Sequence, residues 1–147
     1  MKEELQKPFE ILLVEDNPGD VRLTQEALKQ SDIPTNVNIA VDGEQAVDYV
    51  QGKNDYVTFP EPDLILLDLN LPKKNGLEVL EVIKESDEHK HIPVIIITSS
   101  EAEFDIAKSY ELYANCYITK PVEFDEFNNM VQSIVNFWFS TVKLPKN

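Results

Sequence analysis

The stretch that decides the fold is "DLILLDLNLPKKNG", residues 63–76. The apolar run from Leu64 to Leu67 is typical of a parallel strand that is buried on both faces. This run ends on Asp68, whose charge is costly to bury unless another group binds it. The sequence therefore predicts a central strand with a binding site at its carboxyl end.

Further apolar runs of strand length occur at regular intervals along the rest of the chain. Four such runs flank the central strand: "EILLVE" (10–15), "VNIAV" (37–41), "PVIIIT" (93–98) and "ANCYIT" (114–119). Segments of helical period lie between them, and the first of these begins with Asn17 as a natural N-cap and Pro18 at the first helical position. This alternation favours an α/β fold with a doubly wound parallel sheet and helices on both faces.

Composition limits the function classes. The chain has 147 residues, 42% of them hydrophobic, and 13 basic against 27 acidic residues give a formal net charge of -14. A surface this acidic repels nucleic acid and anionic lipid, and no apolar run approaches the ~20 residues of a membrane span. The first ten residues lack the apolar core of a secretory signal, and the one cysteine, Cys116, reads as a small core residue. We expect one cytoplasmic domain over residues 1–147, with no output domain.

Reactive side chains stand where the predicted strands end. They are Glu15 and Asp16 after the first strand, Asp68 after the third, Thr98 and Ser99 after the fourth, and Lys120 after the fifth. In such a sheet, ligands bind outside the carboxyl ends of the strands. Clustered carboxylates call for a cation, and oxygen ligands suit Mg²⁺ completed by a phosphate. The cluster predicts a phosphoryl site with Asp68 as the nucleophile, Mg²⁺ and Lys120 as neutralising charges and Thr98 as a hydrogen-bond donor.

Four segments resemble, in order and spacing, the receiver domain of two-component response regulators. They are "LLVEDNP" (12–18), "LILLDLNLPKKNG" (64–76), "VIIITSS" (94–100) and "YITKP" (117–121). The resemblance covers about residues 9–140 and implies a chemotaxis-regulator-like, flavodoxin-like fold with the strand order 2-1-3-4-5. It also implies that the chain accepts a phosphoryl group from a sensor histidine kinase. The chain is then not an enzyme, except that it promotes its own phosphorylation and dephosphorylation.

The resemblance implies a role for each acid of the cluster. Asp68 resembles the phosphoacceptor that takes the phosphoryl group from a phosphohistidine, and it is also an expected Mg²⁺ ligand. Asp16 resembles the direct Mg²⁺ ligand and Glu15 the second acid, which acts through water. The backbone carbonyl of Asn70 is expected to complete the metal shell.

Further roles fall on the fourth and fifth strands. Lys120 resembles the phosphate-binding lysine, beside Thr98 and Ser99, and Thr98 is also the expected switch hydroxyl. Tyr117 resembles the aromatic whose rotamer reports the state of the switch. The resemblance implies a cis peptide bond between Lys120 and Pro121, which the small trans preference of such bonds permits.

Two other function classes share parts of this pattern. A Mg²⁺-dependent phosphohydrolase of the haloacid-dehalogenase type needs a second aspartate two residues after the nucleophile, where this chain has Asn70. A flavodoxin-like binding module needs a phosphate-holding loop after the first strand, where "EDNPGD" (15–20) would repel the phosphate. Both are disfavoured, and the receiver remains the first choice.

The last helical segment, within residues 124–145, points to partners. Phe127, Val131, Ile134 and Trp138 form one stripe, and further aromatic residues widen the apolar arc to roughly 200°. We expect a homodimer through this helix, the strand at 114–119 and the helix before it; the alternative is that Phe137 or Phe139 packs near Leu144. Within the family, the chain looks most like single-domain regulators paired with bacterial phytochrome-type histidine kinases.

Overall fold

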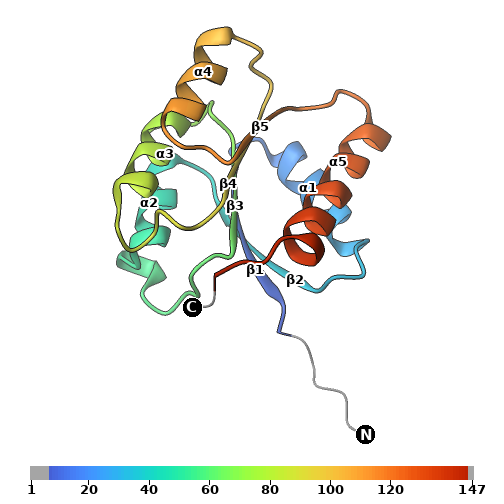
Figure 1. Ribbon diagram of the computed structural model, residues 1–147, viewed down its shortest axis with the longest axis horizontal. Helices are drawn as coiled ribbons and strands as arrows, with labels where there is room; N and C mark the ends of the chain where they lie inside the picture. Colours follow the sequence, from blue (N-terminus) through green and yellow to red (C-terminus); the bar gives the residue numbers. More distant parts are fainter. Residues whose placement is uncertain (1–6, 146–147) are drawn as a thin grey trace, which may run out of the picture.

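The computed structural model describes residues 7–145, and its centre is a parallel sheet of five strands (Figure 1). The strands follow the order β2-β1-β3-β4-β5, so the predicted fold class and strand order are confirmed. Their bounds are β1 Phe9–Val14, β2 Thr35–Ala40, β3 Leu64–Leu67, β4 Val94–Thr98 and β5 Cys116–Thr119. They lie within two residues of the predicted runs, and the charged first ten residues are only partly among those described.

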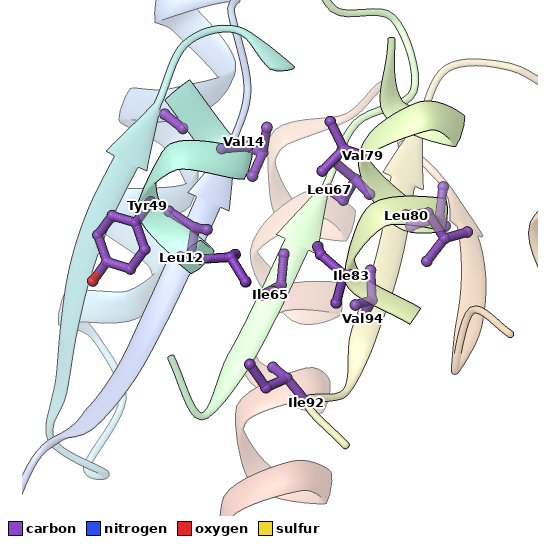
Figure 2. Packing of buried hydrophobic residues seen from close by; sticks show 14 of the residues in the cluster. Leu12, Val14, Tyr49, Ile65, Leu67, Val79, Leu80, Ile83, Ile92 and Val94 are labelled. Atoms are coloured by element: carbon purple, nitrogen blue, oxygen red, sulfur yellow. The ribbon is translucent and has the colours of Figure 1, made fainter. Parts of the chain in front are cut away.

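The three inner strands are buried on both faces, as the unbroken apolar runs predict. Alternate side chains point to opposite faces, so Leu12 and Val14 join one core cluster while Ile11 and Leu13 join the other. Figure 1 shows α2, α3 and α4 on one side of the sheet and α1 and α5 on the other. Figure 2 shows the first cluster, in which the inner strands pack against α2 and α3.

The first three helices begin at a side-chain cap, whereas the last two have no capping side chain, and most of the helices bury one stripe. Their bounds are α1 Pro18–Lys29, α2 Gly43–Gln51, α3 Gly76–Glu85, α4 Glu103–Glu111 and α5 Phe124–Asn136, with a short 3-10 turn η1 at Asn54–Tyr56. Asn17 caps α1 through its side chain, as predicted, and Asn75 forms a full capping box with Glu78 at α3. The α4 helix is the exception, since only Ser109 of its residues is buried.

The C-terminal segment departs from the predicted stripe. Beyond α5 the chain continues as a π-helical turn, η2, over Phe137–Thr141, so the angle of 100° per residue no longer applies there. The ring of Phe139 is buried and stacks on Phe9, with the ring centres 4.1 Å apart. Phe139 belongs to a core cluster against which Leu144 also packs, whereas Phe137 is exposed.

Two further observations concern the backbone. The prediction of a cis bond between Lys120 and Pro121 was wrong, because residues 7–145 contain no cis peptide bond. The trans form is the lower in free energy by about 0.5–1 kcal/mol for an X-Pro bond, so the local sequence does not require the cis isomer. Over the same residues, no helix is both long enough and apolar enough to cross a membrane.

Candidate functional site

Three acids meet at the carboxyl edge of the sheet. Glu15 and Asp16 follow β1, Asp68 follows β3, and a carboxylate oxygen from each lies within 4.8 Å of the others. Glu15 and Asp68 are buried and Asp16 is exposed, so the group opens to solvent on one side. Oxygen donors at this spacing, with space for water, fit a hard divalent cation.

Lys120 lies at the centre of the site. Its Nζ atom is 2.7 Å from a carboxylate oxygen of Glu15, 2.7 Å from one of Asp20 and 2.8 Å from one of Asp68. Its backbone N–H donates to the carbonyl of Thr98, which fixes the end of β5 beside the end of β4. The lysine therefore neutralises part of the charge that the folding of the sheet brings together.

Burial and charge shift the pKa values of this group. Burial raises the pKa of Glu15 to about 7, nearby Asp68 adds to the rise, and Lys120 acts against it. Burial alone would lower the pKa of Lys120, but hydrogen bonds to Asp20, Asp68 and Glu15 raise it above its usual value. The ammonium is thus held in its charged form, while the raised pKa of Glu15, caused chiefly by burial, makes this carboxylate easier to protonate than an ordinary one.

The loop after β3 is fixed tightly around Asp68. The Asn70 N–H donates to Oδ1 of Asp68 at 3.1 Å, so the backbone at Asn70 turns back toward the carboxylate. A Cβ atom on Gly76 would lie 2.4 Å from the Asp68 carbonyl oxygen. At Gly43, the first residue of α2, it would lie 1.8 Å from the carbonyl oxygen of Lys74 in the same loop. Only glycine fits at either contact, which holds the loop against the helices.

The predicted switch residues lie beside this centre. Thr98 is fully buried at the end of β4, whereas Ser99 is exposed. The Tyr117 hydroxyl donates to the carbonyl of Ser100 at 2.9 Å, so its ring reaches under the loop between β4 and α4. Ser100 in turn donates to Asp105 of α4 at 2.6 Å. A chain of hydrogen bonds thus links the β5 aromatic to α4.

Among the predicted site residues, the structure brings Glu15, Asp16, Asp68 and Lys120 together, while Ser99 points toward solvent. Asp20 was missed. It lies in the first turn of α1, four residues before the buried Thr24, so it continues the buried stripe of that helix toward the site. A charged residue at the end of an apolar stripe was the signal that could have found it.

Comparisons with known proteins show the family of the chain. The family described as "Response regulator receiver domain" matches residues 11–132. The response regulator Rcp1 of Synechocystis sp. is 48% identical over 145 residues, which cover 99% of both chains.

Two crystal structures are similar in sequence and in fold. The phosphorylated cyanobacterial phytochrome response regulator RcpA has a TM-score of 0.92 at 46% identity, over 95% of this chain and all of that one (100%). The Mn²⁺-bound form of Rcp1 has a TM-score of 0.90 at 49% identity, over the same shares, 95% and 100%. The chain therefore belongs to the response regulator receiver domain family and is a response regulator related to Rcp1.

Proposed function

We propose that this response regulator accepts its phosphoryl group on Asp68, from a phosphohistidine of a sensor histidine kinase, with Mg²⁺ bound at Glu15, Asp16, Asp68 and the backbone carbonyl of Asn70. The observation that carries this proposal is the contact of the Asp68 carboxylate with the Lys120 ammonium, at 2.8 Å, inside a ring of acids. Among these acids, Asp68 alone stands at the end of a fully buried central strand.

Asp68, Lys120 and Thr98 each have a role in the phosphoryl transfer. An Asp68 oxygen forms the new bond to phosphorus as the bond from phosphorus to the histidine nitrogen breaks, and the leaving imidazole keeps that electron pair. Lys120 donates to an oxygen of the transferred group, and Thr98 offers a buried hydroxyl at the end of β4. A bound Mg²⁺ supplies positive charge to the phosphoryl oxygens.

The same site favours storage of the phosphoryl group over rapid turnover. A phosphohydrolase needs a general acid close to the leaving oxygen, and the residue two positions after Asp68 is Asn70, whose amide is no proton donor of that kind. We therefore expect the chain to act as a phosphoacceptor and not as an enzyme that turns over a separate substrate.

Intact-mass measurement tests the proposal directly. With Mg²⁺ and acetyl phosphate, the chain is expected to gain one phosphoryl group, and Asp68→Asn is expected to gain none because the amide is not nucleophilic. Asp87→Asn, an exposed acid after α3, is the matched control and should be labelled like the wild type. Equal labelling of Asp68→Asn would show that the phosphoacceptor lies elsewhere.

The switch proposed for Thr98 and Tyr117 acts through the face formed by α4, β5 and α5. Phosphorylation adds negative charge and acceptor oxygens, which draw the Thr98 hydroxyl inward and bias the position of Tyr117. The hydrogen bond from Tyr117 to the Ser100 carbonyl supports this route, because any movement of that loop reaches α4 through Asp105.

We also propose a homodimer through this face. Large apolar side chains are exposed along it: Phe104, Tyr110, Val122 and Phe124. We expect Phe104→Glu to weaken self-association by about tenfold or more, because it places a charge in an apolar contact. Val57→Glu is the control, since Val57 and Phe104 are both 69% exposed but Val57 lies in the α2–β3 connection. Sedimentation equilibrium measures both, and an equal effect of the two substitutions would place the dimer contact elsewhere.

The partner kinase is proposed to be of the phytochrome type, in the cytoplasm. The support is the similarity to RcpA, which is described as a phytochrome response regulator, along nearly the whole chain. Transfer rates from purified, phosphorylated kinases test this, and we expect a phytochrome-type kinase to be at least about tenfold faster than a histidine kinase without that module. The reverse preference would contradict the pairing while leaving the role of Asp68 intact.

A further inference from the structure

The strongest unassigned feature of the site is Asp20, a fourth acid that contacts Lys120. Its carboxylate lies 2.7 Å from Nζ, as close as that of Glu15 and closer than that of Asp68. The Lys120 side chain is 10% exposed and that of Asp20 is 28% exposed, so water screens this contact only in part. Asp20 therefore belongs to the electrostatics of the site although no predicted role includes it.

Three carboxylates surround the ammonium group of Lys120. A lysine ammonium has three N–H donors; here it donates to Asp20 and Asp68, and an oxygen of Glu15 lies 2.7 Å away. A phosphoryl group on Asp68 can accept the N–H of Lys120 that Asp68 accepts. A second contact between the phosphoryl group and Lys120 requires that Glu15 or Asp20 lose its own contact with the ammonium. Asp20 is thus a direct competitor of the phosphoryl group for this lysine.

The charge of Asp20 acts in the same direction. Asp20 and Asp68 both contact Nζ of Lys120. The distance between their contacting oxygens therefore cannot exceed the sum of the two contact distances. Phosphorylation of Asp68 adds negative charge at that position. The carboxylate of Asp20 repels this added charge and attracts a cation at Glu15 and Asp16.

The backbone at Asp20 does not depend on its carboxylate. The Asp20 N–H donates to Oδ1 of Asn17, which caps the helix, and the Asp20 carbonyl accepts from the hydroxyl of Thr24. An asparagine at position 20 keeps these contacts and the side-chain shape, and removes only the charge. The effect of the charge can therefore be measured without loss of the helix.

We propose that Asp20 is a positioning residue of the phosphorylation site, which withholds Lys120 from the phosphoryl group and so favours the metal-bound, unphosphorylated state. This inference rests on the proposed roles of Asp68 and Lys120. The charge of Asp20 thus sets the affinity of the site for a cation relative to its affinity for an anionic phosphoryl group.

The test compares two affinities in Asp20→Asn and the wild type by NMR, with the amide signal of Asn70 as the probe. The first titration uses Mg²⁺ alone, and the second uses beryllofluoride, a mimic of the phosphoryl group, at saturating Mg²⁺. We expect the Kd for Mg²⁺ to rise about twofold or more and the half-saturating beryllofluoride concentration to fall about threefold or more, because one negative charge is removed close to both. A variant that merely loosened the site would bind both ligands more weakly.

Three results would overturn the inference: weaker binding of both ligands, unchanged binding of both, or the same shifts in the control Glu26→Gln. Glu26 lies on the same helix, is exposed and pairs with Lys29, so its substitution removes one charge without contact to Lys120. Asp68→Asn distinguishes a failure of this inference from a failure of the proposed function. If that variant still binds beryllofluoride like the wild type, the proposed function fails; if it does not bind while Asp20→Asn matches the wild type, only the inference fails.

Discussion

Lys120→Met is expected to lower the free energy of unfolding by about 3 kcal/mol in EDTA at pH 8, since loss of one partner from a buried ion pair typically costs this much. The ammonium contacts Glu15, Asp20 and Asp68, and methionine leaves these acids facing one another with no positive charge among them. Part of the repulsion is relieved if Glu15 takes up a proton, because its pKa already lies near 7. For this reason the expected loss is at the lower end of the range for such pairs.

Mg²⁺ is expected to restore most of this stability. The cation takes over the neutralising charge at Glu15, Asp16 and Asp68, and a ligand that binds only the folded chain stabilises it by an amount that grows with the logarithm of the ligand concentration above its Kd. Urea unfolding with EDTA and with Mg²⁺ measures both effects. The control is Lys108→Met, whose ion pair with Glu111 is exposed and whose loss should change stability by less than about 0.5 kcal/mol.

A loss in Lys120→Met no greater than in the Lys108 control would show that the acids tolerate one another without the lysine. A large loss that Mg²⁺ leaves unchanged would show that the lysine acts through packing and not through its charge.

Gly43→Ala is expected to destabilise the chain by about 3 kcal/mol, which is the upper range for a forced steric overlap in a well-packed region. The added Cβ atom would lie 1.8 Å from the carbonyl oxygen and 2.6 Å from the carbonyl carbon of Lys74, so backbone must move. The displaced loop also carries Asn70. We therefore expect slower phosphorylation of Asp68 in this variant in addition to the lower urea midpoint.

Gly19→Ala is the matched control, because Gly19 also lies in the first turn of a helix. Its nearest neighbour would be the flexible Asn17 side chain at 3.2 Å, and alanine favours helix, so its stability should stay close to the wild type. Equal stability of Gly43→Ala and the wild type would show that the contact between α2 and the loop yields at little cost.

Much of the fold follows from the sequence, because the inner strands are recognisable as unbroken apolar runs. The run from Leu64 to Leu67 has no polar residue, which is typical of a parallel strand covered on both faces by helices. The position of Asp68 at its end, together with Glu15 and Lys120 at the ends of other strands, then follows from the parallel direction of the sheet. These predictions needed periodicity and topology, and no side-chain geometry.

The features that escaped prediction depend on contacts between distant parts of the chain. The contact of Asp20 with Lys120 joins residues 100 positions apart, so the position of Asp20 at the end of the buried stripe of α1 indicates burial but does not identify Lys120 as its partner. The burial of Phe139 depends on a π-helical turn that rotates the end of the chain and on Phe9, which stacks on it. A helical wheel assumes a constant angle and cannot anticipate that rotation.

The stacking of Phe9 on Phe139 also has a consequence for how the chain is made. The first strand lies between β2 and β3 in the sheet, and its aromatic residue is covered by the last helical turn of the chain. A ribosome makes proteins from the amino end, so this partner of Phe9 is made only after all five strands. The first strand must wait for residue 139 before its core is closed, and folding of this domain is completed only after its last helix has been made.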